Sequence, residues 1–223
     1  GRPSHTSFSR RNGSDQGGRP ETDTARRMAI GILGNGLHYA KQFEGALSVG
    51  EAELAMLRRV GAPEDIMLVA QGNLATTYNT LGRHEQAIHM FRDVHLGYAR
   101  LLNEEDRSNI IAALGHTFPL LCLQRFAEAK ALLQKMIPVA QRALGESDEL
   151  TLRMRARYAT ALYGDPAATL DDLREAVATL EEIERTARRV LGGAHPLTEI
   201  IEDDLRKSRA ALRARETPSP GSA

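Results

Sequence analysis

The sequence contains no tryptophan, few aromatic residues, one cysteine and no excess of either charge. Aromatic residues make up 4% of the 223 positions, while Ala, Leu, Arg and Glu, which favour helices over β-sandwich strands, recur throughout. Lys and Arg number 29, as do Asp and Glu, so the formal net charge is zero. Nucleic-acid and membrane-surface binders usually carry excess basic charge. The composition therefore predicts an all-α protein whose partner is neither nucleic acid nor membrane.

The single cysteine and the short apolar runs indicate the cellular setting. Cys122 has no second cysteine with which to form an internal disulfide. It lies in the apolar run PLLCL, which predicts a small buried thiol rather than a nucleophile. No apolar run approaches the roughly 18 residues of a membrane span. We therefore expect a reducing, cytoplasmic location, with an organelle or a large assembly as alternatives.

Two phrases recur along the chain at nearly constant spacing. RALGESDELTLRM at 142–154 reappears in weaker form as RVLGGAHPLTEII at 189–201, an offset of 47 residues. LGRHEQAI at 81–88 aligns with LQRFAEAK at 123–130 at an offset of 42. A period of this size is typical of stacked units that cannot bury their apolar faces alone. The sequence therefore predicts a solenoid of tandem helix-turn-helix repeats with a period of about 42 residues.

Each repeat is expected to contain a shorter helix, a tight turn and a longer helix. The expected helices are 25–40, 43–58, 65–81, 84–101, 106–122, 126–144, 148–164, 167–191 and 196–215. The last of these is a C-terminal capping helix. The repeat domain then covers 25–215, and we expect the Gly- and Ser-rich lead-in at 1–24 and the tail at 216–223 to be disordered.

Local residue choices indicate where particular helices begin and where insertions lie. Asp165 and Pro166 suit the N-cap and first position of a helix, and Pro196 is expected to begin the last helix in the same way. The longer spacing of 47 residues is explained by five extra residues near 163–172, at a turn, where an insertion costs little.

Apolar stripes mark the longer helices, and two prolines lie inside expected helices. The expected buried stripes are Ala87, Phe91, Val94, Tyr98 and Leu101, then Ala129, Leu133, Met136, Ala140 and Leu144, and in the last helix Leu197, Ile201, Leu205, Ser208 and Leu212. Pro119 and Pro138 each remove a helical hydrogen bond, which predicts kinks near these positions.

One stretch, GNLATTYNTLGRHEQAIHMF, resembles the tetratricopeptide repeat. The residues that fit the pattern of that family are Leu74, Ala75, Tyr78, Gly82, Ala87 and Phe91. The phrase VLGGAHPLT and the 42-residue spacing resemble the kinesin-light-chain-like group, in particular its algal and protist members, over residues 27–216. This resemblance implies a right-handed superhelical solenoid in which the first helix of each pair lines a concave, partner-binding face.

By the repeat register, ten polar or aromatic side chains belong to that face. They are Asn35, His38, Asn73, Thr76, Asn79, Phe118, Arg153, Arg157, Thr160 and Tyr163. Asn side chains can satisfy peptide backbone groups, apolar residues can accept a side chain, and Arg can pair with carboxylates. An acidic peptide with a large apolar residue is therefore the expected partner.

Less specific interpretations remain open for several of these positions. Asn35 and Asn73 resemble two positions of a carboxylate clamp, but Ile111 and Gly115 stand where its basic pair is expected. Ile111, Leu114 and Phe118 either form a peptide pocket or are buried against the neighbouring repeat. Three arginines at 153, 155 and 157 cannot all share one helix face, so ordinary surface ion pairs are an alternative to a binding patch.

Catalytic and metal-binding patterns are weak in this sequence. His84, His89 and His95 are five and six residues apart and would point to different helix faces. GILGNG at 31–36 lacks the Lys-Ser or Lys-Thr of a phosphate-binding loop. We therefore expect a non-catalytic interaction module without a metal or cofactor. The alternatives are a structural subunit of a larger assembly and the regulatory repeat region of a longer protein.

Overall fold

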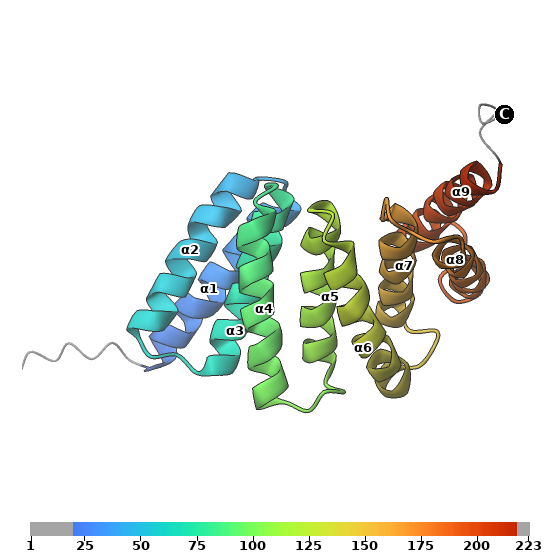
Figure 1. Ribbon diagram of the computed structural model, residues 1–223. Coiled ribbons are helices and arrows are strands. Elements are labelled where there is room, and N and C mark those ends of the chain that lie inside the picture. The colour runs from blue at the N-terminus through green and yellow to red at the C-terminus, as the bar shows by residue number, and fades with distance from the viewer. Residues whose placement is uncertain (1–19, 218–223) are drawn as a thin grey trace, which may run out of the picture.

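The computed structural model describes residues 20–217, which form nine helices and no strand (Figure 1). The helices are α1 (Pro20–Tyr39), α2 (Phe43–Arg59), α3 (Glu64–Thr80), α4 (His84–Leu101), α5 (Arg107–Cys122), α6 (Phe126–Leu144), α7 (Glu149–Gly164), α8 (Leu170–Val190) and α9 (Pro196–Glu216). The predicted bounds are confirmed to within one residue except at the starts of α1 and α8. Because α1 begins at Pro20, the end of the expected lead-in is helical, while 1–19 and 218–223 lie outside the described residues.

The helices stack as a two-layered row in which each helix packs against the next one along the chain (Figure 1). The odd-numbered helices also contact one another, α1 with α3, α3 with α5, α5 with α7, and α7 with α9. Within residues 20–217, the even-numbered helices make no comparable contacts with one another. The odd-numbered layer is therefore the more tightly spaced side of the solenoid, and we call its exposed surface the odd-helix face.

The phrase that recurs in the sequence builds the junction between repeats. Gly145 and Gly192 follow α6 and α8 with φ values of 91° and 92°, a backbone conformation that glycine adopts without strain. A side-chain acceptor then caps the next helix. Asp148 accepts from the Leu150 backbone N–H, and His195 accepts from that of Leu197. The prediction that Pro196 begins the last helix is confirmed.

The start of α8 differs from the sequence prediction. Thr169, not Asp165, is the N-cap, because Thr169 and Asp172 form a capping box in which each side chain accepts from the other residue's backbone N–H. Asp165 instead accepts from the Ala167 N–H within the preceding turn. That turn spans 165–169, whereas the equivalent turns at 40–42, 81–83 and 123–125 are shorter, and α8 is itself a long helix of 21 residues. The five extra residues that lengthen the repeat spacing from 42 to 47 are thus divided between this turn and α8.

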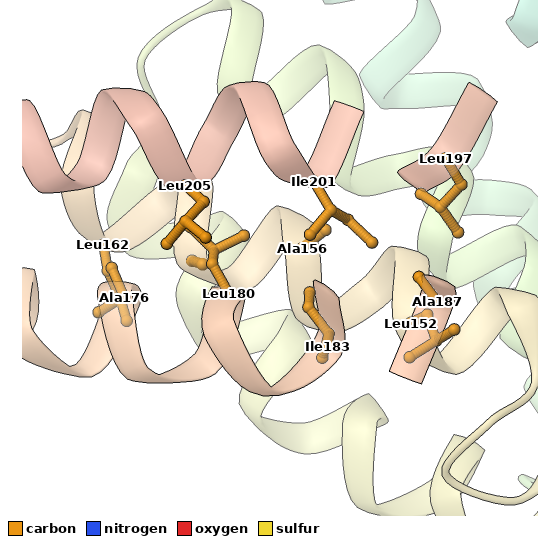
Figure 2. Packing of buried hydrophobic residues seen from close by; sticks show 11 residues of the cluster. Leu152, Ala156, Leu162, Ala176, Leu180, Ile183, Ala187, Leu197, Ile201 and Leu205 are labelled. Atoms are coloured by element: carbon orange, nitrogen blue, oxygen red, sulfur yellow. The ribbon is translucent and has the colours of Figure 1, made fainter. Parts of the chain in front are cut away.

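Apolar side chains between the layers form the core, and α9 closes it at the C-terminal end. Figure 2 shows Leu197, Ile201 and Leu205 of α9 facing Leu180 and Ile183 of α8. Most residues of the three predicted stripes are buried, but Tyr98, Leu144 and Leu212 are only partly buried, and Leu101, the last residue of α4, is exposed. Pro119 and Pro138 lie inside α5 and α6, which continue through them, so the kinks stay a prediction.

None of the helices within residues 20–217 combines the length and the apolar character that crossing a membrane requires.

Two partly buried imidazoles between α4 and α5 make stability depend on pH. Burial, together with the nearby His95, Arg125 and Arg92, lowers the pKa of His116 from 6.5 to about 4, and Glu128 offsets this only in part. The Nδ1 atoms of His95 and His116 have no hydrogen-bond partner among the described residues. Protonation therefore favours the unfolded chain.

We expect the free energy of unfolding to fall as the pH is lowered from about 6.5 towards 4. Over this range the unfolded chain binds a proton at His116 that the folded chain does not. The expected loss is roughly 1–2 kcal/mol, after discounting for partial exposure. Urea denaturation at a series of pH values measures it, with His116→Gln as the control. An equally steep pH dependence in His116→Gln would contradict the assignment.

Candidate protein-binding surface

Four hollows lie along the odd-helix face, each between neighbouring odd-numbered helices. One of them, of about 250 Å³ between α5 and α7, is lined by Ile111 of α5 and by Arg153 and Arg157 of α7. The N-terminal hollow, between α1 and α3, has a volume of about 210 Å³. The middle hollow, between α3 and α5, measures about 290 Å³, and the C-terminal hollow, between α5, α7 and α9, about 370 Å³. Their succession along one face provides room for an extended chain.

The N-terminal hollow brings together four of the predicted site residues, which are Asn35, His38, Asn73 and Thr76. The Thr77 hydroxyl lies 3.4 Å from the His38 Nδ1 atom at its base. Glu53 also lines the hollow, and burial raises the pKa of its carboxyl group. The lining thus combines polar side chains with apolar surface, and its amide groups are available to a peptide backbone.

The middle hollow exists because two glycines leave the layer beneath uncovered. Gly72 and Gly115 carry no side chain, so Phe91 and Val94 of α4 form part of the lining. Exposed Val69 and Ile111 lie at its edge. The hollow is therefore suited to a large apolar side chain.

The sequence reasoning left the role of Ile111 open and did not find Val69. The placement of two glycines in consecutive first helices, Gly72 and Gly115, is the signal that would have revealed this hollow. Leu114, the third apolar position in question, is buried in the core of α5, α6 and α7.

The C-terminal hollow combines apolar side chains with a desolvated guanidinium group and, from α9, the Asp204 carboxylate. Arg157 lies over the exposed Phe118 ring, 5.4 Å from its centroid, in a cation–π arrangement. It donates to the Leu114 carbonyl oxygen and to the Thr117 hydroxyl, the latter at 2.9 Å. Burial, and to a lesser degree Arg153, lowers the pKa of Arg157 to about 10, and no carboxylate contributes to this pKa. Arg157 therefore keeps its charge at neutral pH in an environment that favours an added anion.

The three alternating arginines of α7 separate as the sequence predicted. Arg153 lines the C-terminal hollow beside Arg157 and pairs with Glu149 of its own helix. Arg155 points to the other side, where it pairs with Glu182 of α8 at 2.6 Å. Two of the three arginines therefore belong to the odd-helix face.

Three other predicted site residues form contacts within the fold. Tyr163 donates to Asp204 of α9 at 2.8 Å, and the Thr160 hydroxyl lies 3.3 Å from the same carboxylate. Burial and the adjacent Asp204 raise the pKa of Tyr163, so its hydroxyl keeps its proton. Asn79 lies near the α3–α4 turn, where its side-chain oxygen is 2.8 Å from the His84 Nδ1 atom. These contacts hold the capping helix and a turn in place.

The prediction that Cys122 is buried is wrong. The residue is exposed, because it lies in the last turn of α5, where its side chain lines the C-terminal hollow. Partial desolvation raises the pKa of its thiol, which keeps the sulfur protonated and a poor nucleophile. Within residues 20–217, no group of three or more His, Cys, Asp or Glu side chains is placed to hold a metal ion.

The comparison with family models identifies one repeat directly. Residues 67–108, which include most of α3 and all of α4, match the tetratricopeptide repeat model. This stretch of the chain is a tetratricopeptide repeat, one of the stacked helix pairs of the solenoid. In this framework the N-terminal and middle hollows both involve α3, the first helix of the matched repeat.

Solved structures extend the likeness to the whole solenoid. A Podosopora anserina protein, described as a kinesin light chain with nearly identical TPR-like repeats, is 20% identical, with a TM-score of 0.71 over 86% of this chain and 88% of that chain. BtubC (BKLC) from P. vanneervenii is 15% identical, with a TM-score of 0.59 over 91% and 87%. At these identities the likeness establishes a kinesin-light-chain-like fold. A comparison with curated proteins finds no significant match.

Proposed function

We propose that the chain is a non-catalytic interaction module that binds an acidic peptide carrying a large apolar residue along the odd-helix face. Tetratricopeptide folds are typical of protein-interaction scaffolds, which supports the general class. The C-terminal hollow supports the finer statement, because its Arg157 is desolvated, has no carboxylate contribution to its pKa and lies on an apolar floor.

A carboxylate placed beside Arg157 offsets the cost of burying the guanidinium group. Arg153 lies in the same hollow, so an acidic residue of the partner has two cations to contact. Apolar contacts from Phe118 and Ile200 add affinity that does not depend on charge. The middle hollow, with Val69 and Ile111, receives the large apolar residue.

The N-terminal hollow contributes in a different way. Asn35 and Asn73 offer amide donors and acceptors to the peptide backbone. Hydrogen bonds to the backbone do not depend on the sequence of the peptide. Specificity thus arises mainly in the middle and C-terminal hollows. Asn79 and Tyr163 act indirectly, through contacts that fix the turn and the capping helix, whereas Thr160 contacts the capping helix and also lines the C-terminal hollow.

Selection from a phage-displayed library of random dodecapeptides on the full chain tests this proposal. Enriched peptides are expected to combine Asp or Glu with a large apolar residue. Arg153→Glu, which reverses the charge in the C-terminal hollow, is expected to weaken binding of a selected peptide by about tenfold or more. Fluorescence anisotropy with the labelled peptide measures the change.

Arg100→Glu is the matched control. Arg100 is an exposed arginine on α4 that pairs with Glu64, as Arg153 pairs with Glu149, but it lies on an even-numbered helix. The Arg100→Glu variant is expected to bind the peptide with the same affinity as the parent chain. Equal weakening by both substitutions, or selected peptides without acidic residues, would overturn the proposal.

A further inference from the structure

The outward side of α1 exposes an apolar surface at the N-terminal end of the described solenoid. Four large apolar side chains of this helix are mostly exposed: Met28 (64%), Ile32 (72%), Leu33 (53%) and Tyr39 (87%). The segment 28–40 contains no Asp, Glu, Lys or Arg. Soluble proteins rarely leave such a continuous apolar surface in water without a partner.

The opposite side of α1 already packs against the solenoid. A Cβ atom added at Gly34 would meet Val49 of α2 at 3.5 Å, and one added at Gly31 would meet Glu53 at 3.0 Å. At Gly36, on the outward side, an added Cβ atom would meet nothing within 4 Å. The exposed apolar row is therefore a second face of α1, separate from the one that builds the fold, although Tyr39 at its end also lines the N-terminal hollow.

The two ends of the solenoid differ in character. On α9 the residues beyond the buried stripe include exposed charged groups, among them Arg206 and Lys207, which pair with Asp203. A charged end of this kind is a solvated cap. Head-to-tail stacking would place the apolar α1 face against these charges and desolvate them, which disfavours open filaments.

We propose that the outward face of α1 is a two-fold interface between two copies of this chain. A second copy offers the same charge-free apolar row, so the surfaces match without like-charge repulsion, and the zero net charge of the chain adds no long-range repulsion. Like faces meeting around a two-fold axis give a closed dimer.

The exposed area is sufficient for such a contact. The four large side chains expose on the order of 500 Å² per copy, so the pair buries about 1,000 Å², near the lower limit for a specific interface. Ala29 and Gly36, also exposed on this helix, are small enough to let two helix backbones approach closely. An area at this limit predicts a dimer that dissociates on dilution, with a micromolar dissociation constant.

Light scattering coupled to size-exclusion chromatography tests the interface, using the full chain loaded from about 1 to 100 µM. The expected mass rises with concentration towards twice the 24.5 kDa of one chain. Ile32→Glu and Ile32→Lys are each expected to remain monomeric with an unchanged circular-dichroism spectrum, because Ile32 is exposed. An equimolar mixture of the two is expected to regain dimer, since opposite charges then face each other across the interface.

Leu96→Glu is the control, because Leu96 is an exposed leucine on α4 and the same kind of change there leaves α1 intact. It is expected to dimerise as the parent does. A parent that is monomeric at 100 µM, or Ile32 variants that dimerise as the parent does, would overturn the proposal. Dimerisation that appears only after removal of residues 1–19 would also overturn it, because that segment would then be the occupant of this face.

Discussion

Ile201→Ala is expected to lower the free energy of unfolding by about 2–4 kcal/mol, the typical cost of a large-to-small change in a packed core. Ile201 is 0% exposed and lies between the capping helix and the side chains of α7 and α8 (Figure 2). Truncation leaves a cavity where α9 seals the solenoid. Urea denaturation followed by circular dichroism measures the change.

The adjacent Ile200 provides the matched control. It is 52% exposed and lines the C-terminal hollow, so Ile200→Ala is expected to change stability by less than about 0.5 kcal/mol. The same substitution is expected to weaken binding of the selected acidic peptide severalfold. A stability loss at Ile200 equal to that at Ile201 would show that α9 packs in another register.

Gly115→Ala is expected to lower the free energy of unfolding by about 1–3 kcal/mol, although alanine favours a helix more than glycine does. A Cβ atom at Gly115 would lie 2.5 Å from the Phe91 ring, closer than real contacts allow. The ring is rigid and belongs to the core, so ring or helix must move. Thermal or urea denaturation measures the loss.

Gly72→Ala is the corresponding control, because Gly72 lines the same hollow. There an added Cβ atom would meet Val94 at 4.0 Å, an ordinary contact, so the substitution is expected to raise stability by about 0.5–1 kcal/mol. A loss of stability in Gly115→Ala together with a gain in Gly72→Ala would confirm the packing of α5 on α4. Stabilisation by both substitutions would contradict it.

The repeat period allowed the fold to be predicted from the sequence, because similar turn residues and buried apolar positions recur in successive repeats. The positions of Gly145 and Gly192 mark two helix ends, and the stripe at Leu197, Ile201 and Leu205 marks a buried helix face. Such signals involve residues only a few positions apart, so they can be recognised in the sequence alone. The start of α8 was predicted wrongly because two nearby signals compete, and the Thr169–Asp172 capping box prevailed over Asp165.

The character of the site depends on contacts between repeats, which local patterns do not reveal. Arg157 was predicted to line the binding face, but its desolvation follows from its position over Phe118 and Leu114, about 40 residues earlier. The bond from Tyr163 to Asp204 likewise joins helices far apart in the sequence. The exposure of Cys122 depends on how α5 ends beside α7, which the apolar run around it does not show.

The most direct test of peptide binding on the odd-helix face is photo-crosslinking with the library-selected acidic peptide. p-Benzoylphenylalanine is placed at Val69 on α3, at Phe118 on α5, or at Leu96 on α4, all of which are exposed. Crosslinks are read by mass spectrometry of the illuminated complex. The account predicts that the peptide is captured from positions 69 and 118 and not from position 96. Capture from position 96 alone would contradict it and place the binding surface on the even-numbered helices.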